Sequence, residues 1–328
     1  MFKPFRKTSP NISKKIRSKK RVAVEWLCGA LSFAYFLFYW ENNVIDVTRY
    51  ERFDRRIPQA LDGTTVVQIS DLHGKRFGRN DSKLMAKVRK ENPDLIAVTG
   101  DLIDERDPKP ERAKEVISRL AEIAPVFYVT GNHEGAFIDS FQAKVLDAIE
   151  KGGAYLLDNR QVEIIRGEDG KLKFEPFERG TEHTPTPNSI LLAGICDPET
   201  TYSTMIPRIK QYRLNTEIME DLLKEVPVDR NQFCALLTHR PEFLAKYARY
   251  GIDLALTGHA HGGQFRCPGL LPNGLYAPDQ GFFPKYTCGR YDLDGTTEIV
   301  SRGLGSSVVP TRIFNRPNLV VCKLRTEP

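Results

Sequence analysis

The chain has 328 residues, 41% of them hydrophobic and 27% charged, which is the composition of an ordinary globular protein and excludes a chain that is disordered throughout. Its length allows one large α/β domain or two small ones. The formal net charge of +6 does not indicate a nucleic-acid-binding protein, because residues 1–21 hold nine Lys and Arg and no acidic residue, and the remainder has 39 basic against 42 acidic residues.

An apolar segment from Val22 to Trp40 follows this basic tail, and its only charged residue is Glu25. Nineteen helical residues at about 1.5 Å each span the hydrocarbon core of a bilayer, and Trp26 and Trp40 fall near its two interfaces. A buried core helix is the alternative, but this segment has no polar stripe. The pattern therefore predicts a transmembrane anchor over residues 22–40.

The charges on the two sides of this segment predict its orientation. Nine cations precede it, whereas Glu41, Asp46 and Arg49 follow it, so the positive-inside rule places residues 1–21 in the cytoplasm as a basic tail and residues 41–328 outside. A cleaved signal peptide is the competing interpretation, but bulky aromatic residues end the segment where a small-X-small cleavage site is needed. We expect a single-pass protein of the cell membrane with one extracytoplasmic domain.

Short apolar runs alternate with amphipathic segments through the rest of the chain. We expect strands over residues 44–50, 65–70, 95–99, 126–130, 189–195, 233–238, 252–256, 297–301 and 319–324, with helices between several of them. This alternation predicts a parallel-sheet core, in which binding sites form outside the carboxyl ends of the strands.

Three further features of the sequence lead to expectations about loops and cysteines. Residues 167–188 are polar and rich in Gly, Pro, Glu and Thr, so we expect an exposed loop in which His183 has no functional role. Cys267 and Cys288 flank a loop, and a disulfide between them is as plausible as two free thiols. The aromatic residues of that loop either line an acyl-chain groove or pack in the core: Tyr276, Phe282, Phe283 and Tyr286.

Polar side chains follow several of the predicted strands directly. Five of the six histidines stand at such positions in glycine-containing loops, together with two aspartates and an asparagine: Asp71, His73, Asp101, Asn132, His133, His239, His259 and His261. Nitrogen and oxygen donors without a thiolate suit Mn²⁺, Fe or Zn²⁺.

These eight groups are too many for one metal ion, but a carboxylate shared between two ions accounts for most of them. Two ions about 3.5–4 Å apart clamp a phosphate and activate a bridging water as a nucleophile. The set of residues therefore favours phosphoester hydrolysis.

The same residues resemble the motif set of the calcineurin-like metallophosphoesterases. The motifs occur in the family's order: Asp71-Leu72-His73, Gly100-Asp101, Gly131-Asn132-His133-Glu134, Thr238-His239 and Gly258-His259-Ala260-His261. The resemblance runs from about Asp62 to the C-terminus and implies an α/β fold, a four-layer α/β/β/α sandwich, here preceded by one transmembrane helix. Three further sequence segments resemble the membrane-associated bacterial phosphodiesterases, a branch that includes UDP-2,3-diacylglucosamine pyrophosphatase-like enzymes. These segments are Gln68 to His73, Gly262-Gly263-Gln264 and Gly281 to Tyr286.

The resemblance also implies a role for each donor. One ion would bind Asp71, His73, Asp101 and His261, and the second would bind Asp101 as the bridge together with Asn132, His239 and His259. His133 would lie near the phosphate, where it stabilises charge or protonates the leaving oxygen as a general acid. We interpret three nearby cations as solvated charges rather than phosphate ligands: Arg76, Arg240 and Lys285.

The sequence thus predicts a membrane-anchored phosphoesterase with two divalent ions per chain, Mn²⁺ being favoured over Fe or Zn²⁺. Its substrate would carry a phosphodiester, phosphomonoester or pyrophosphate bond, with a lipid-linked phosphoester as one option, and residues 22–40 would contact the lipid bilayer. The alternatives are a non-catalytic binding module of the same fold, and a nuclease of the same superfamily. No nucleic-acid partner is expected, because the body of the protein is slightly acidic.

Overall fold

The computed structural model describes residues 19–135, 139–177, 184–201, 208–306, 309 and 311–327. The chain divides into two compact units, Met1–Trp40 and Glu41–Pro328. His183 and most of the basic tail lie outside the described residues.

Helix α1, Lys19–Asn43, contains the predicted anchor. Among the described residues, its stretch Arg21–Asn43 is the one helix long and apolar enough to cross a membrane, and none of its most apolar window is buried. A core helix of a water-soluble domain would be largely buried, so this exposure favours the membrane-spanning interpretation.

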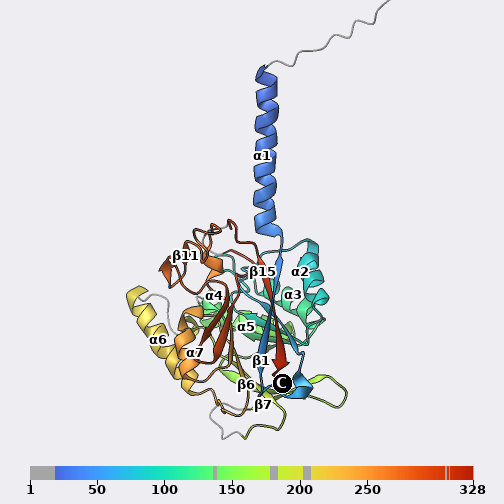
Figure 1. The fold of residues 1–328 in the computed structure, drawn as a ribbon, viewed down its shortest axis with the longest axis vertical. Helices are drawn as coiled ribbons and strands as arrows, with labels where there is room; N and C mark the ends of the chain where they lie inside the picture. The colour runs from blue at the N-terminus through green and yellow to red at the C-terminus, as the bar shows by residue number, and fades with distance from the viewer. Residues whose placement is uncertain are drawn as a thin grey trace, which may run out of the picture. The chain divides into compact units, whose positions relative to one another are not determined.

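Two large β-sheets form the centre of the second unit (Figure 1). The first has the strand order β1-β15-β2-β3-β4-β5, with β1 Asp46–Asp54, β15 Asn318–Thr326, β2 Thr65–Ile69, β3 Leu95–Thr99, β4 Val126–Val129 and β5 Ala154–Leu156. The second has the order β13-β14-β10-β9-β8-β6-β7, with β13 Gly289–Leu293, β14 Thr296–Val300, β10 Leu254–Thr257, β9 Cys234–Leu237, β8 Ile190–Gly194, β6 Arg160–Arg166 and β7 Leu172–Phe177. A separate pair consists of β11 Tyr276–Ala277 and β12 Gly281–Phe282.

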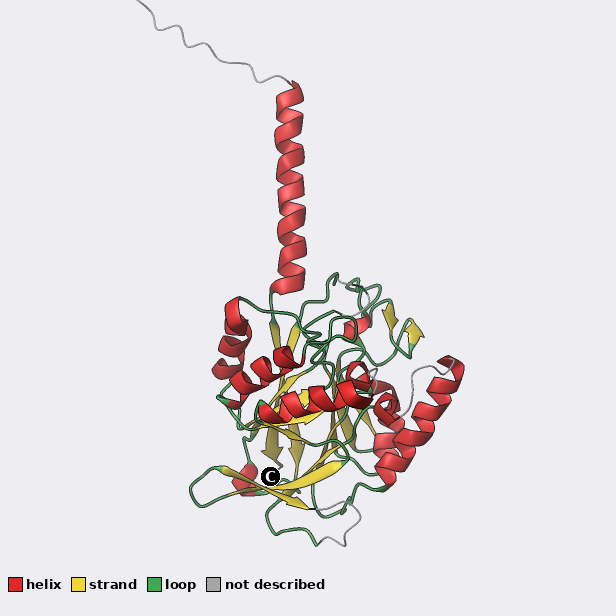
Figure 2. Ribbon diagram, turned by 180° about the vertical axis from the view of Figure 1, so that it is seen from behind, coloured by secondary structure: helices red, strands yellow, loops and turns green. Residues whose placement is uncertain are grey.

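Helices cover the outer face of each sheet (Figures 1 and 2). The first sheet packs against α2 Ser82–Lys90, α3 Pro110–Ala121 and α5 Asp139–Lys151, and the second packs against α6 Arg208–Lys224 and α7 Leu244–Arg249. The single-turn helix α4, Asn132–Gly135, follows β4.

Alternation along β2 shows why the sheets form two inner layers. Val67 and Ile69 point toward the helices of the first sheet, whereas Val66 shares an apolar cluster with Leu192 and Ala235 of the second sheet. Successive side chains of a strand point to opposite faces, so each fully buried strand contributes to two cores. The expected four-layer α/β/β/α sandwich is confirmed.

The strands that carry the predicted site run parallel within each sheet. β2 pairs with β3 and β3 with β4 in the first sheet, and β9 pairs with β10 in the second, all in parallel register. Their carboxyl ends therefore lie along one edge of each sheet.

One expectation about the rest of the domain needs correction, and one alternative that the sequence left open is settled. The expected loop at residues 167–188 contains β7, which pairs antiparallel with β6 and places Phe174 against the core between the sheets. Cys267 and Cys288 are free thiols, and the Cys288 sulfur accepts a hydrogen bond from Arg266 at 2.6 Å.

Candidate metal centre

The eight predicted site residues meet where five strands end. Asp71 and His73 follow β2, Asp101 follows β3, Asn132 and His133 begin α4 after β4, His239 follows β9, and His259 and His261 follow β10. All are buried except Asn132, which is half-buried. The two sheets thus contribute side chains to a single cluster.

Five of these residues have a left-handed backbone. Their φ angles are 51° at Asp71, 47° at His73, 54° at Asp101, 63° at His259 and 48° at His261. This region is sparsely populated by residues with a Cβ and costs of order 1–3 kcal/mol per residue, and such strain concentrates at functional sites. The surrounding loops therefore hold these side chains in unfavourable backbone conformations for a reason other than stability.

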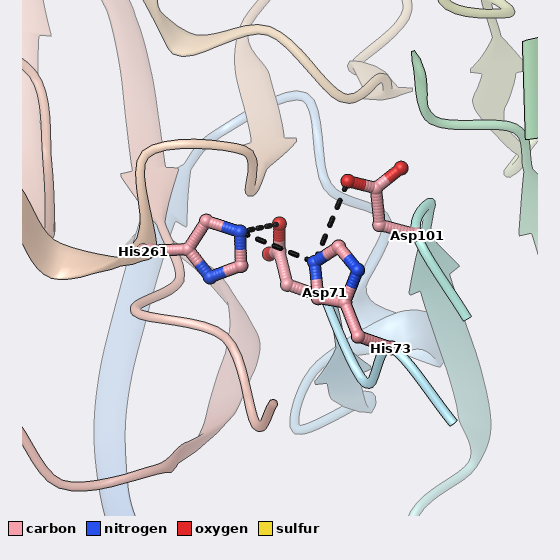
Figure 3. A group of neighbouring side chains, drawn as sticks. All are labelled: Asp71, His73, Asp101 and His261. Carbon is pink, nitrogen blue, oxygen red and sulfur yellow. Dashed lines mark hydrogen bonds and ion pairs between the residues drawn. The ribbon is translucent and has the colours of Figure 1, made fainter. Parts of the chain in front are cut away.

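Four of the side chains form the first group (Figure 3). One donor atom from each of Asp71, His73, Asp101 and His261 lies within 4.8 Å of the others. His73 Nε2 is 3.1 Å from His261 Nε2 and 3.6 Å from Asp101 Oδ2, and His261 Nε2 is 3.6 Å from Asp71 Oδ1. The two imidazoles and the two carboxylates converge on one point, as expected for a shared ligand.

A second group adjoins the first through Asp101. The ligand atoms of Asp101, His239 and His259 lie within 4.8 Å of one another. His239 Nε2 is 3.3 Å from Asp101 Oδ2, 3.2 Å from His259 Nδ1 and 3.2 Å from the side-chain oxygen of Asn132. The same carboxylate oxygen of Asp101 therefore faces both groups.

Glycines allow the loops to approach this closely. A Cβ on Gly258 would lie 1.9 Å from Ser70 Oγ and 2.5 Å from Asp71 Oδ2, and a Cβ on Gly131 would lie 2.2 Å from Asp101 Oδ1. Any side chain at these two positions would displace a predicted ligand.

The donor set fits divalent cations. Oδ2 of Asp71 is buried and has no hydrogen-bond partner among the described residues. A buried carboxylate oxygen without a partner is costly, so this atom indicates a ligand that brings positive charge. Imidazole nitrogens and carboxylate oxygens are donors that Mn²⁺, Fe and Zn²⁺ accept.

Electrostatics favour the same ligand. Burial lowers the pKa of His73 to about 3, so its imidazole is neutral and keeps a lone pair for a metal. Burial also opposes charge on His239, but the carboxylates of Asp101 and Asp71 outweigh it and raise the pKa of His239 to about 10. A proton on His239 and a divalent cation would therefore compete for the negative charge of Asp101 and Asp71.

His133 stands beside the two groups without belonging to the first or second. Its Nδ1 accepts a hydrogen bond from the backbone N–H of Glu105 at 3.1 Å, and its Nε2 lies 4.0 Å from Asp101 Oδ2. Because Nδ1 is the acceptor, the neutral ring carries its proton on Nε2, which faces the cluster. His133 can therefore donate a proton or a hydrogen bond into the site.

Asp279 is a site contact that the sequence did not indicate. His259 Nε2 donates to Asp279 Oδ2 at 2.9 Å, which leaves the lone pair on Nδ1 directed at the second group. Burial would raise the pKa of Asp279, but the guanidinium of Arg240 holds it well below its usual range.

Arg240, expected to be a solvated charge, is fully buried and also binds Asp197 at 2.6 Å, so that expectation was wrong. The other two cations, at positions 76 and 285, are exposed as expected.

Glu134 fixes the loops that carry the shared carboxylate. It accepts backbone hydrogen bonds from Asp101 and Gly131 at 2.9 Å and from Leu102 at 3.0 Å. Burial, with the charge of Asp101, raises the pKa of Glu134 to about 7. The sequence offered no signal for this role beyond its place after Asn132 and His133.

A family comparison decides the class of protein. The sequence model of the calcineurin-like phosphoesterase family matches residues 64–263. The chain belongs to this family. As a calcineurin-like phosphoesterase it is a hydrolase of phosphoric esters that uses divalent metal ions, and the resemblance inferred from the motifs is confirmed.

Several metallophosphoesterases are similar to the chain over most of its length. It is 27% identical over 294 residues to the uncharacterized metallophosphoesterase YkuE of Bacillus subtilis, covering 88% of each chain. It is 25% identical to the phosphodiesterase YaeI of Escherichia coli, covering 79% of this chain and 81% of that one. It is 29% identical to a transmembrane protein with metallophosphoesterase domain from Danio rerio, covering 80% of this chain and 54% of the fish protein.

Proposed function

We propose that the protein is a membrane-anchored phosphoesterase with two divalent cations in its site, Mn²⁺ being favoured over Fe or Zn²⁺. One ion is held by Asp71, His73, Asp101 and His261, and the other by Asp101, Asn132, His239 and His259. The position of Asp101 carries the proposal, because its Oδ2 lies 3.6 Å from His73 Nε2 and 3.3 Å from His239 Nε2. A single carboxylate oxygen between two groups of donors is the arrangement that a two-metal site needs.

Different residues of the site have different roles in the proposed hydrolysis. When bound, the two cations neutralise phosphate oxygens and lower the pKa of a water molecule enough to make it a nucleophile at neutral pH. His133 directs its Nε2 proton toward the same space and protonates the leaving oxygen. Asp279 and Glu134 keep the donors in place through His259 and through the backbone of Asp101.

The proposal includes the place of the enzyme in the cell. Residues 22–40 anchor it in the cell membrane, with residues 1–21 in the cytoplasm and the catalytic domain, residues 41–328, outside. The apolar stretch Arg21–Asn43 and the relatives from Danio rerio and Bos taurus that are named as transmembrane proteins support the anchor, and the basic tail supports its orientation. A lipid-linked phosphate or pyrophosphate suits a site that is held close to a bilayer.

Asp101→Asn tests the metal centre. We expect the full-length protein in detergent to hydrolyse an aryl phosphodiester with added Mn²⁺ and to bind two ions per chain. The variant should lose more activity than the about 10–100-fold typical of residues that only support a ligand, because it removes the shared carboxylate. Asp221→Asn, on the exposed face of α6, is the matched control and should behave as the parent protein. Equal activity in Asp101→Asn and the control contradicts the two-metal mechanism.

A further inference from the structure

Five large apolar side chains are exposed on neighbouring loops of the domain. They are Leu270 at 75%, Phe282 at 70%, Phe283 at 71%, Ile313 at 45% and Phe314 at 59% exposure, and we refer to them as the apolar rim. Outside α1, the described residues include only two further exposed large hydrophobic side chains, Phe53 and Tyr155. Exposed apolar residues gathered on one part of a surface mark an interaction site.

Backbone hydrogen bonds hold the loops of the apolar rim side by side. The N–H of Arg266 donates to Ile313 at 3.0 Å, the N–H of Leu275 donates to Phe265 at 2.9 Å, and the N–H of Phe283 donates to Leu275 at 2.9 Å. Four chain segments thus lie next to one another, like strands of a small sheet. The apolar rim therefore belongs to a set of loops that are hydrogen-bonded to one another.

The apolar rim is tied to the residues that connect the domain to the apolar helix. Asn42 accepts a hydrogen bond from the N–H of Arg312 at 2.8 Å and donates one to its carbonyl at 3.2 Å. The N–H of Asn315 donates to the Glu41 carboxylate at 3.2 Å. Ile313 and Phe314 lie between these two tied positions in the chain.

This connection links the Ile313 and Phe314 part of the apolar rim to residues that directly follow the apolar segment in the chain. At about 1.5 Å per helical residue, Asn42 lies about 3 Å along the helix from Trp40, the end of the apolar segment. A bilayer crossed by that segment would therefore end near Asn42, to which the backbone of Arg312, next to Ile313, is hydrogen-bonded. At that level an apolar side chain meets lipid rather than water.

The polar neighbours of the apolar rim suit the same environment. Lys285 lies with its ammonium 4.7 Å from the ring of Tyr286, and the ring of Tyr276 contacts that of Phe282 at 5.5 Å between centroids. Tyrosine rings and long cationic side chains are enriched at the membrane–water interface, where one end is apolar and the other is polar. Lipid headgroups therefore match this surface better than a dry protein interface does.

The loops of the apolar rim also hold the metal centre. Asn315 donates to the carbonyl of His261 at 2.7 Å, and Asp279, between β11 and β12, accepts from His259 at 2.9 Å. Figure 1 shows β11 at the edge of the domain. A membrane that covers the apolar rim would therefore lie next to the site.

We propose that the apolar rim inserts into the interfacial layer of the bilayer that α1 spans, and so holds the metal centre at the headgroup level. The inference rests on the proposed membrane anchor. A phosphoester in the headgroup layer would then reach the site without leaving the membrane.

Depth-dependent quenching of tryptophan fluorescence tests this docking. The chain has only two tryptophans, Trp26 and Trp40, so replacing both with Phe leaves a full-length protein in which a new Trp is the sole fluorophore. Phe283→Trp and Phe314→Trp are made separately in this background and reconstituted into phosphatidylcholine vesicles with and without brominated acyl chains. We expect a blue-shifted emission and a loss of intensity in the brominated vesicles at both positions.

Two controls make the outcomes distinct. Tyr155→Trp, at a side chain that is 56% exposed on β5, should show no bromine quenching, and Trp40 kept alone reports on the anchor itself. Quenching of Trp40 without quenching at positions 283 and 314 overturns the docking and leaves the anchor intact. Absence of quenching at Trp40 as well overturns both the docking and the anchor. A blue shift that bromine does not affect, and that disappears on dilution of the protein in lipid, overturns lipid docking in favour of a second copy of the chain.

Discussion

Single residues in the site are assigned their chemistry by what each ring nitrogen contacts. His133 accepts the Glu105 N–H on Nδ1, so its proton lies on Nε2 and faces the cluster. His259 has the opposite arrangement, because Nε2 donates to Asp279 and Nδ1 presents a lone pair to the second group. Burial keeps the pKa of His73 near 3, which excludes it as a proton donor at neutral pH. Of these three rings, His133 is the one suited to acid catalysis.

Substitution of His133 by Gln should separate this role from metal binding. We expect kcat to fall by about 10²–10⁴-fold, the usual contribution of a general acid, while the metal content stays that of the parent protein. The loss should be larger for an alkyl leaving group than for p-nitrophenolate, which leaves without protonation. Steady-state rates on the two substrates and metal analysis of the variant give these values. A loss that is equal for both leaving groups would assign His133 to charge stabilisation, and a loss of metal would contradict its place outside the ligand set.

At the level of elements, the sequence predicted where the strands of the site end. It did not predict the side-chain contacts that hold the site residues in place. Periodic apolar runs located β2, β3, β4, β9 and β10, and polar residues after these runs marked the site, because both signals are local in sequence. Asp279 and Arg240 contribute through contacts across 20 to 43 residues of chain, which no local pattern encodes. β7 was missed because this edge strand is at most half-buried and its polar flanks resemble a loop.

The connection between β5 and β6 gives a testable pH dependence. Asp158 accepts hydrogen bonds from the N–H and hydroxyl of Thr130 at 2.9 Å, at the end of β4, and burial raises its pKa to about 6. Its ordinary value is 3.8, so between about pH 4 and pH 6 the folded protein binds more protons than the unfolded one, and stability falls as the pH rises. This rise in the pKa of Asp158 lowers the free energy of unfolding by about 3 kcal/mol above pH 6.

Asp158→Asn should remove this penalty, because an amide can still accept the N–H of Thr130 and can donate to its hydroxyl. We expect a higher free energy of unfolding than in the parent protein at pH 8, with a smaller gain at pH 5. Urea denaturation of the detergent-solubilised protein, followed by circular dichroism at both pH values, measures the two differences. A gain that is the same at pH 5 and pH 8, or a loss at pH 8, would be inconsistent with a raised pKa of Asp158.

For the whole molecule, the distribution of charge predicts one orientation of the proposed anchor in a membrane. Nine cations precede the apolar segment, whereas the rest of the chain carries 39 basic and 42 acidic residues and so has no comparable positive cluster to retain it in the cytoplasm. In the proposed topology the short cationic tail stays in the cytoplasm, so we expect residues 41–328, including the metal centre, to be exported. A lipid-linked substrate would have to reach the outer leaflet of the same membrane.

Accessibility of single cysteines to a membrane-impermeant maleimide in spheroplasts tests this topology. Cys28 is first replaced by Ala, because it is exposed on α1, and the half-buried Cys267 and Cys288 are replaced by Ser, whereas Cys196, Cys234 and Cys322 are buried. In this background we expect a cysteine in place of Asp169, at the exposed turn between β6 and β7, to react before lysis, and one in place of Ser13, in the basic tail, to react only after lysis. The reason is that nine positive charges resist transfer across the bilayer, while the slightly acidic domain does not. The reverse pattern would place the metal centre in the cytoplasm, and reaction at neither position before lysis would show that the domain is not exported.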